Sequence, residues 1–251
     1  MSKKKIVLTK EESKLTPFVV RSEVEPGKKY YEYREEIRWD FFYSCAYCTI
    51  MEFEGQTIGF SIDHYQPSEK FSDLEHVYGN LMYSCNHCNS RKSDIFPSEK
   101  ALEDGIRYFR PDQDIHEDHF GLVSDMLTAK TKIGEFTIIV IGLNRGTLKK
   151  LRRIRSSIDK TTNHVIEGIK ALKKVNTDSI PPRYKVRARE TIKSLERVNE
   201  NLLGDMDTII REIAKSPLAD KEEDSDVKIN KQRTLKQLKA IYPDWVNRKK
   251  T

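Results

Sequence analysis

Hydrophobic and polar positions divide the first part of the chain into short elements. Apolar side chains recur near helical spacing over residues 30–42, which predicts one helix. Residues 57–62 alternate like a strand that ends before a polar, irregular loop at residues 65–79. A second short strand is predicted at residues 80–84, and a helix from residue 86 to about residue 94. Strand, loop, strand and helix in this order predict a ββα unit.

The segments on either side of this unit are less regular. We expect an irregular arm over residues 1–27, interrupted by prolines, with one short strand at residues 18–20. Residues 99–146 form a connecting region. Within it, the β-branched run at residues 135–143 predicts a buried strand, paired with a strand at residues 120–123.

The last part of the chain favours long helices. Residues 147–175 carry an apolar stripe at helical spacing, and residues 184–215 carry a heptad pattern in which Asn199 is the polar core position. We interpret the two as an antiparallel helical hairpin, although the heptad face with Asn199 could support a homodimer instead. The predicted fold class is α+β, with divisions at residues 1–98 (arm and ββα core), 99–146 (connecting α+β region with short strands), 147–215 (helical hairpin) and 216–251 (acidic linker and basic tail).

Composition and charge narrow the class of protein only slightly. Charged residues make up 33% and hydrophobic residues 37% of the 251 residues, as expected for a soluble cytoplasmic protein rich in helix. The formal net charge of +6 leans towards polyanionic partners, although many proteins without such partners are equally basic. No apolar run approaches the roughly 18 residues of a membrane span, and the apolar stretch near the basic N-terminus is too short for a secretory signal.

All four cysteines lie in two Cys-x-x-Cys knuckles, Cys45-Ala-Tyr-Cys48 and Cys85-Asn-His-Cys88, with 36 residues between them. In a cytosolic chain such pairs are typical of zinc ligands and not of disulfides. Four thiolates close the tetrahedral shell and leave no position for water, so the Zn²⁺ is expected to be structural. Four buried free thiols are the alternative. The acidic stretch around His116 and His119 is more typical of a surface loop than of a second metal site.

Between the knuckles stands Asp63-His64, at the predicted end of the first strand. Histidine is the side chain whose unperturbed charge change falls near neutral pH, so His64 suits a general base that takes a proton from water. The Asp63 carboxylate is a hard oxygen ligand of the kind that Mg²⁺ or Mn²⁺ prefers. Asn80 could orient the loop so that a backbone carbonyl holds the second ring nitrogen of His64, although taken by itself Asn80 is better interpreted as a turn residue after Gly79.

The helix that begins at the second knuckle carries Asn89 and Lys92 on one face, three residues apart. The amide oxygen of Asn89 can join Asp63 in holding the cation. Lys92, with Arg91 nearby, can pair with a substrate phosphate, and a helix N-terminus also favours an anion. These residues complete a set that a purely structural zinc clamp would not require.

The motifs in sequence order are Cys45-x-x-Cys48, Asp63-His64-x-x-Pro67, Asn80-Leu81 and Cys85-x-x-Cys88-Asn89-x-x-Lys92. Together they resemble the HNH endonuclease (ββα-metal) family in its zinc-stabilised form. The resemblance implies a metal-dependent endonuclease in which His64 is the general base and Asn80 supports it. It also implies that Asp63 and Asn89 hold one catalytic Mg²⁺ or Mn²⁺, and that DNA is the substrate ahead of RNA.

A second likeness lies downstream, in residues 137–144 followed by Leu148 and Arg152. This segment resembles a bacterial HNH subgroup that includes the nuclease subunits of Septu-type and retron-associated anti-phage systems, which act beside an ATPase partner. The resemblance implies a role in antiviral defence with such a partner. Two alternatives stay open: a zinc-dependent nucleic-acid-binding module without catalysis, and an interaction subunit whose basic helices dock on a partner.

Overall fold

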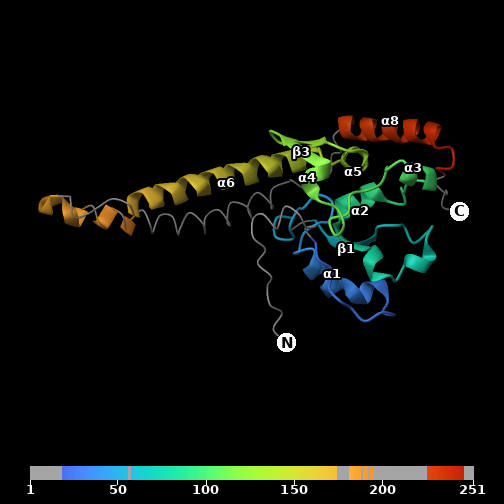
Figure 1. Ribbon diagram of the computed structural model, residues 1–251, viewed down its shortest axis with the longest axis horizontal. Coiled ribbons are helices and arrows are strands. Elements are labelled where there is room, and N and C mark those ends of the chain that lie inside the picture. Colours follow the sequence, from blue (N-terminus) through green and yellow to red (C-terminus); the bar gives the residue numbers. More distant parts are fainter. Residues whose placement is uncertain are drawn as a thin grey trace.

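The chain folds around the predicted ββα unit (Figure 1). Strand β1 (Phe60–His64) pairs antiparallel with β2 (Leu81–Cys85), with Phe60 opposite Cys85 and His64 opposite Leu81. Helix α2 (Asn86–Lys92) follows β2 without a loop. The predicted order of elements is confirmed, and β1 ends at Asp63-His64 as predicted, although it begins at Phe60.

The computed structural model describes residues 19–55, 58–173, 181–187, 189–191, 193–194 and 225–245. Within these residues, helices surround two small antiparallel sheets of two strands each, so the predicted α+β class is confirmed. No helix in this described part combines the length and the apolar character that crossing a membrane requires.

A helical segment packs beside the ββα unit, as the sequence predicted for residues 30–42. A 3₁₀ turn (Tyr30–Tyr33) leads into helix α1 (Arg34–Asp40). Its inner face buries Tyr33, Ile37 and Phe41, the apolar positions at helical spacing. This face anchors the segment that enters the first cysteine knuckle.

Within the ββα unit itself, two 3₁₀ turns, Ser72–Leu74 and Tyr78–Asn80, lie in the predicted loop at residues 65–79 and at its end.

Short elements connect the ββα unit to the long helices. The elements that follow α2 are α3 (Glu99–Glu103), α4 (His116–His119), β3 (Phe120–Val123) and β4 (Met126–Ala129). The strand predicted at residues 120–123 is therefore confirmed as β3, but it pairs with β4 in a hairpin.

The strand predicted at residues 135–143 is wrong, because most of these residues belong to helix α5 (Lys132–Ile141). The Thr131 hydroxyl caps the helix by accepting a backbone hydrogen bond at 3.2 Å, and Gly142 ends it in the left-handed region at φ 71°. The residues that α5 buries are Gly134, Phe136, Thr137, Val140 and Ile141. The two caps and this burial outweigh the strand preference of the β-branched side chains.

The strand expected at residues 18–20 is also wrong where the structure describes it. Val19 and Val20 have irregular backbone, and Phe18 lies outside the described residues. The Val19 N–H donates to the Pro111 carbonyl at 2.9 Å, and the Ser22 N–H donates to the Asp40 carboxylate at 2.8 Å. These bonds fix the arm without forming a strand ladder.

Helix α6 (Gly146–Lys173) projects away from the rest of the molecule (Figure 1). It confirms the helix predicted over residues 147–175. Its first turns pack on the body, where Leu148 and Leu151 are buried. Helical backbone continues at residues 182–187, 189–191 and 193–194, while the remainder of the predicted second helix, with Asn199, lies outside the described residues.

Helix α8 (Ser225–Ile241) lies within residues 216–251, the region predicted as an acidic linker and basic tail. It lies beside α5 (Figure 1). After it, the Tyr242 hydroxyl donates to the Asp104 carboxylate at 2.6 Å. The buried ring of Trp245 lies 5.8 Å from that of Phe136, measured between centroids. The end of the described chain therefore closes over α5.

Candidate metal centre and active site

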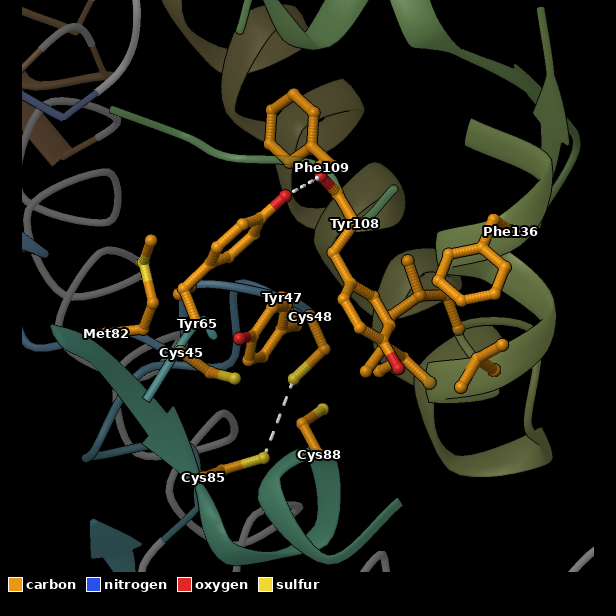
Figure 2. Packing of buried hydrophobic residues seen from close by; sticks show 14 of the residues in the cluster. Cys45, Tyr47, Cys48, Tyr65, Met82, Cys85, Cys88, Tyr108, Phe109 and Phe136 are labelled. Carbon is orange, nitrogen blue, oxygen red and sulfur yellow. Dashed lines mark hydrogen bonds between the residues drawn. The ribbon is translucent and has the colours of Figure 1, made fainter. Parts of the chain in front are cut away.

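Four sulfur atoms converge at the N-terminal end of α2 (Figure 2). The Sγ atoms of Cys45, Cys48, Cys85 and Cys88 all lie within 4.8 Å of one another, and those of Cys48 and Cys85 are 3.8 Å apart. Sulfur ligands about 2.3 Å from a tetrahedral zinc ion lie about 3.8 Å from each other. The donor set and the spacing therefore fit the structural Zn²⁺ predicted from the sequence, and all four cysteines are buried.

Backbone hydrogen bonds build this site from two separate segments. The Cys45 N–H donates to the Ile50 carbonyl at 2.9 Å, which closes the first knuckle. The Ala46 N–H donates to the Tyr83 carbonyl at 2.8 Å, which joins that knuckle to β2. Cys85 is both the last residue of β2 and the N-cap of α2, so the second pair of cysteines lies at the start of the helix.

A buried arginine, which no sequence motif singled out, lies beside the sulfurs. Arg145 directly precedes α6, and its Nη2 donates to Cys88 Sγ at 3.7 Å. Burial by itself lowers the pKa of this guanidinium, but the sulfurs of Cys88, Cys48 and Cys85 outweigh it and raise that pKa. Burial also raises the pKa of the Cys45 thiol, whereas hydrogen bonds with the other three cysteines bring it well below its ordinary value. Hydrogen bonds with the other cysteines and burial raise the pKa of the Cys85 thiol, and burial raises that of Cys88. The four sulfurs therefore need a bound cation before all of them can be thiolates.

His64 lies at the end of β1, where the loop at residues 65–79 folds back over it. Its Nε2 is 2.9 Å from the Glu75 carbonyl oxygen. A carbonyl can only accept a hydrogen bond, so Nε2 carries the proton and Nδ1 keeps its lone pair. The Tyr30 ring stands edge-on to the imidazole, with centroids 5.0 Å apart. The Glu75 carbonyl selects the tautomer that a general base requires, and the Tyr30 ring packs against the imidazole.

Asn80 ties the two ends of this loop together. Its Oδ1 accepts a hydrogen bond from the Gln66 N–H at 2.9 Å. Its Nδ2 donates to the carbonyls of Gln66 and Leu74 at 3.0 and 3.2 Å. Leu74 precedes Glu75, whose carbonyl meets the His64 ring. Asn80 thus fixes the loop that holds His64, in the arrangement that the sequence suggested.

Asp63 is the centre of a buried polar network between β1 and α2. One of its carboxylate oxygens accepts a hydrogen bond from Lys92 Nζ at 3.0 Å, and the other accepts one from the Tyr47 hydroxyl. Lys92 Nζ also donates to the His64 carbonyl at 2.6 Å. Asp63 is 5% exposed and Lys92 is 0% exposed. The network joins β1, α2 and the first knuckle.

The substrate contact expected of Lys92 needs correction, whereas that of Arg91 stays a prediction. Lys92 is enclosed by Asp63 and the backbone of His64, so its ammonium group does not reach a phosphate outside the fold. The Arg91 guanidinium lies against α5, where a Cβ atom on Gly142 would meet its Nη1 at 3.0 Å. Sequence spacing identified the helix face that carries Lys92, but not the carboxylate that buries it.

A cleft of about 240 Å³ lies between the end of β1 and α2. Its lining residues are Ile62, Asp63, His64, Pro67, Ser68, Glu69, Asn89, Ser93 and Asp94. Asn89 Nδ2 donates to Ser61 Oγ at 2.9 Å, which leaves the amide oxygen of Asn89 as the atom available to a ligand. Glu69 and Asp94 add two carboxylates that no motif had singled out.

The oxygen donors of this cleft fit a hard divalent cation. A carboxylate has about four lone-pair sites, so Asp63 can keep its two hydrogen bonds and still bind a metal ion. Asp63 and Asn89 would supply two protein oxygens, and water and phosphate oxygens commonly complete such a shell around Mg²⁺. Within the described residues, the four cysteines are the one group of three or more His, Cys, Asp or Glu side chains close enough to hold an ion. His116 and His119 form no second site of that kind there.

Comparisons with known proteins agree with the motifs. Septu protein PtuA of Bacillus mycoides (strain KBAB4) is 28% identical to this chain, in a match that covers 43% of the chain and 18% of the relative's length. No solved structure matches the chain. The HNH endonuclease family model matches residues 45–94, which span both knuckles and the cleft. The family resemblance of the motifs is thereby confirmed, and residues 45–94 of this chain are an HNH endonuclease domain.

Proposed function

We propose that this chain is a divalent-metal-dependent endonuclease that hydrolyses phosphodiester bonds in DNA. The observation that carries the proposal is the 2.9 Å hydrogen bond between His64 Nε2 and the Glu75 carbonyl. It leaves Nδ1 as the basic nitrogen of an imidazole that lines a cleft together with Asp63 and Asn89. The HNH domain at residues 45–94 supports nuclease activity in general.

Each residue of the cleft has its own part in the proposed reaction. His64 Nδ1 takes a proton from a water molecule as the water oxygen attacks phosphorus in line. The bond between phosphorus and the 3′ oxygen breaks, and that oxygen takes a proton from solvent, which gives a 5′-phosphate and a 3′-hydroxyl. Asn80 and the Glu75 carbonyl keep the imidazole in that orientation. Asp63 and Asn89 would hold Mg²⁺ or Mn²⁺, which would supply Lewis-acid stabilisation of the negative charge that develops in the reaction.

The biological part of the proposal rests on two likenesses. The relative is named as a Septu protein, and residues 137–144 with Leu148 and Arg152 resemble the HNH subunits of anti-phage systems. We therefore infer that the chain acts in the cytoplasm as an anti-phage effector together with a partner ATPase.

Supercoiled plasmid DNA tests the chemistry. Zinc-loaded protein should nick or linearise the plasmid when Mg²⁺ or Mn²⁺ is added and leave it intact otherwise. His64→Ala should cut about 10²- to 10⁴-fold more slowly, because the general base is lost. Cleavage by this variant at the wild-type rate would refute the role of His64.

His76→Ala is the matched control for this experiment. The His76 ring stacks on Tyr30 with centroids 6.1 Å apart, one ring removed from His64, and it does not line the cleft. Its replacement removes a nearby imidazole without touching the proposed base, so cleavage should continue close to the wild-type rate.

A second candidate function is a zinc-dependent nucleic-acid-binding or interaction subunit without catalysis of its own. It is favoured by the Asp63 carboxylate, both of whose oxygens already accept hydrogen bonds, from Lys92 and from Tyr47. Zinc-loaded protein that shifts the plasmid in a gel but leaves it intact with both metals would support this candidate against the nuclease.

A further inference from the structure

Arg145 is a buried cation that meets sulfur where a carboxylate would be expected. It is 7% exposed, and its guanidinium donates to Cys88 Sγ at 3.7 Å and to the Gly142 carbonyl at 3.3 Å. In the part of the chain that the structure describes, Arg145 forms no ion pair with a carboxylate. The more exposed arginines of α6 differ, since Arg153 pairs with Asp125.

A guanidinium in this place needs a negative neighbour, because a buried charge is strongly destabilising unless it is paired. Four neutral thiols would not compensate it. Four thiolates around one divalent cation carry two net negative charges, and they would. The charge of Arg145 is therefore matched to the metal-loaded form of the cysteine site.

We propose that Arg145 is the counter-charge of the four-cysteine metal site, and that metal occupancy thereby fixes the corner between α5 and α6. The inference rests on a metal ion at the cysteines and is independent of nuclease activity. The corner is built on this residue, because the N–H groups of Leu148 and Lys149 donate to the Arg145 carbonyl at 3.0 and 3.1 Å. Arg145 lies outside residues 45–94, so the contact joins the later helices to the HNH domain.

A second arginine of α6 reaches the other knuckle. The Nη2 atom of Arg155 donates at 2.9 Å to the carbonyl of Thr49, the residue that follows Cys48. Helix α6 and its preceding corner thus contact both knuckles, through Arg145 at Cys88 and through Arg155 beside Cys48. Loss of the metal ion should therefore loosen the root of α6 as well as the knuckles.

Competition with a chromophoric chelator tests the counter-charge in the full-length, zinc-loaded protein. Arg145→Gln should hold zinc about 10- to 100-fold less tightly than the wild type, the usual effect of losing an outer-shell partner of a metal ligand. Arg145→Lys keeps the charge and should hold zinc more tightly than Arg145→Gln. The matched control Arg153→Gln removes an arginine that pairs with Asp125 and should equal the wild type. Wild-type zinc affinity in Arg145→Gln would overturn the proposal.

Cobalt substitution distinguishes a charge contact from packing alone. Replacing the guanidinium changes the hydrogen bond to the Cys88 thiolate, so the sulfur-to-cobalt charge-transfer band should shift in Arg145→Lys and stay in place in Arg153→Gln. An unshifted band in Arg145→Lys would mean that the arginine does not contact the metal-bound sulfur, and would overturn the proposal.

Hydrogen exchange of the wild-type protein needs no variant that could fail to fold. Removing zinc should speed exchange at the amides of Leu148 and Lys149, while the hairpin of β3 and β4 keeps its protection. Unchanged protection at Leu148 and Lys149 would contradict the coupling between metal and corner. Equal acceleration in the hairpin would also contradict it, because the response would then be global.

Discussion

The two ends of helix α2 carry buried polar clusters of different kinds. At the N-terminal end the four cysteines gather beside Arg145, and at the C-terminal end Lys92 meets Asp63 and Tyr47. The first cluster requires an ion to balance four thiolates, whereas the second is balanced by its own opposite charges and a phenol. The comparison teaches that a metal site can be recognised from the spacing of its ligands. The role of a single charged residue depends instead on what folds against it.

The largest expected effect is the loss of one sulfur ligand. Cys88→Ser breaks the four-thiolate shell, and structural zinc binding contributes about 10–16 kcal/mol of apparent free energy to folding at neutral pH. The variant should lose its zinc and much of its helical circular dichroism, as measured beside the zinc content by native mass spectrometry. Ser90→Ala changes an exposed residue of the same helix and should keep both. A folded Cys88→Ser protein with wild-type zinc content would contradict the four-cysteine site.

Breaking the second cluster should have a smaller but still large effect. Lys92→Met leaves the Asp63 carboxylate buried without its partner and should lower the free energy of unfolding by about 3–5 kcal/mol. The double variant Lys92→Met with Asp63→Asn should lose less free energy of unfolding than the sum of the two single variants, because it no longer buries an unpaired carboxylate. Denaturant unfolding measures both, with Lys100→Met as an exposed control. Additive losses would show that the two side chains do not interact.

The cysteine cluster should also respond to pH. In the absence of metal the pKa of the Cys45 thiol lies below its ordinary value, whereas the pKa values of Cys85 and Cys88 lie above it, so their contributions to the pH dependence of stability oppose one another. Metal binding decides the pH response, because all four thiols must lose their protons to bind zinc. Zinc binding should weaken on acidification by about 1.4 kcal/mol per pH unit for each proton taken up. Chelator competition at a series of decreasing pH values measures the zinc affinity, and an affinity that does not change with pH would argue against thiolate ligands.

The smallest expected effect concerns the positioning of Asn89. Ser61→Ala removes the hydroxyl that accepts the Asn89 amide hydrogen bond, and such a bond is worth about 0.5–1.5 kcal/mol. The binding free energy of Mn²⁺, measured by isothermal titration calorimetry on the zinc-loaded protein, should weaken by a similar amount. Ser68→Ala removes another hydroxyl of the cleft and should bind Mn²⁺ like the wild type. Unchanged affinity in Ser61→Ala would argue against Asn89 as a ligand.

Much of the ββα unit could be predicted because its chemistry is expressed in local spacing. The two knuckles, the Asp63-His64 pair and the helix that begins at the second knuckle all lie within residues 45–94. Helix α5 could not be predicted in the same way, because its β-branched residues favour a strand locally. Capping by Thr131 and Gly142 and burial against later segments decide its conformation.

The contacts that escaped prediction join residues far apart in the chain. Lys92 meets Asp63 across 29 residues, and Arg145 meets Cys88 across 57. Periodicity indicates which face of an element a side chain occupies, but not which charge that face will meet. For this reason Lys92 could be placed on the correct helix and still be given the wrong partner.

Because the root of helix α6 contacts the cysteine site, small movements at that site are amplified along the helix. Its 28 residues, rising about 1.5 Å each, make a rod about 42 Å long that leaves the body of the molecule (Figure 1). A tilt of about 10° at the root moves the far end of such a rod by about 7 Å. A small change in the contact between Arg145 and Cys88 at the root would therefore displace the distal end of α6 by several ångströms.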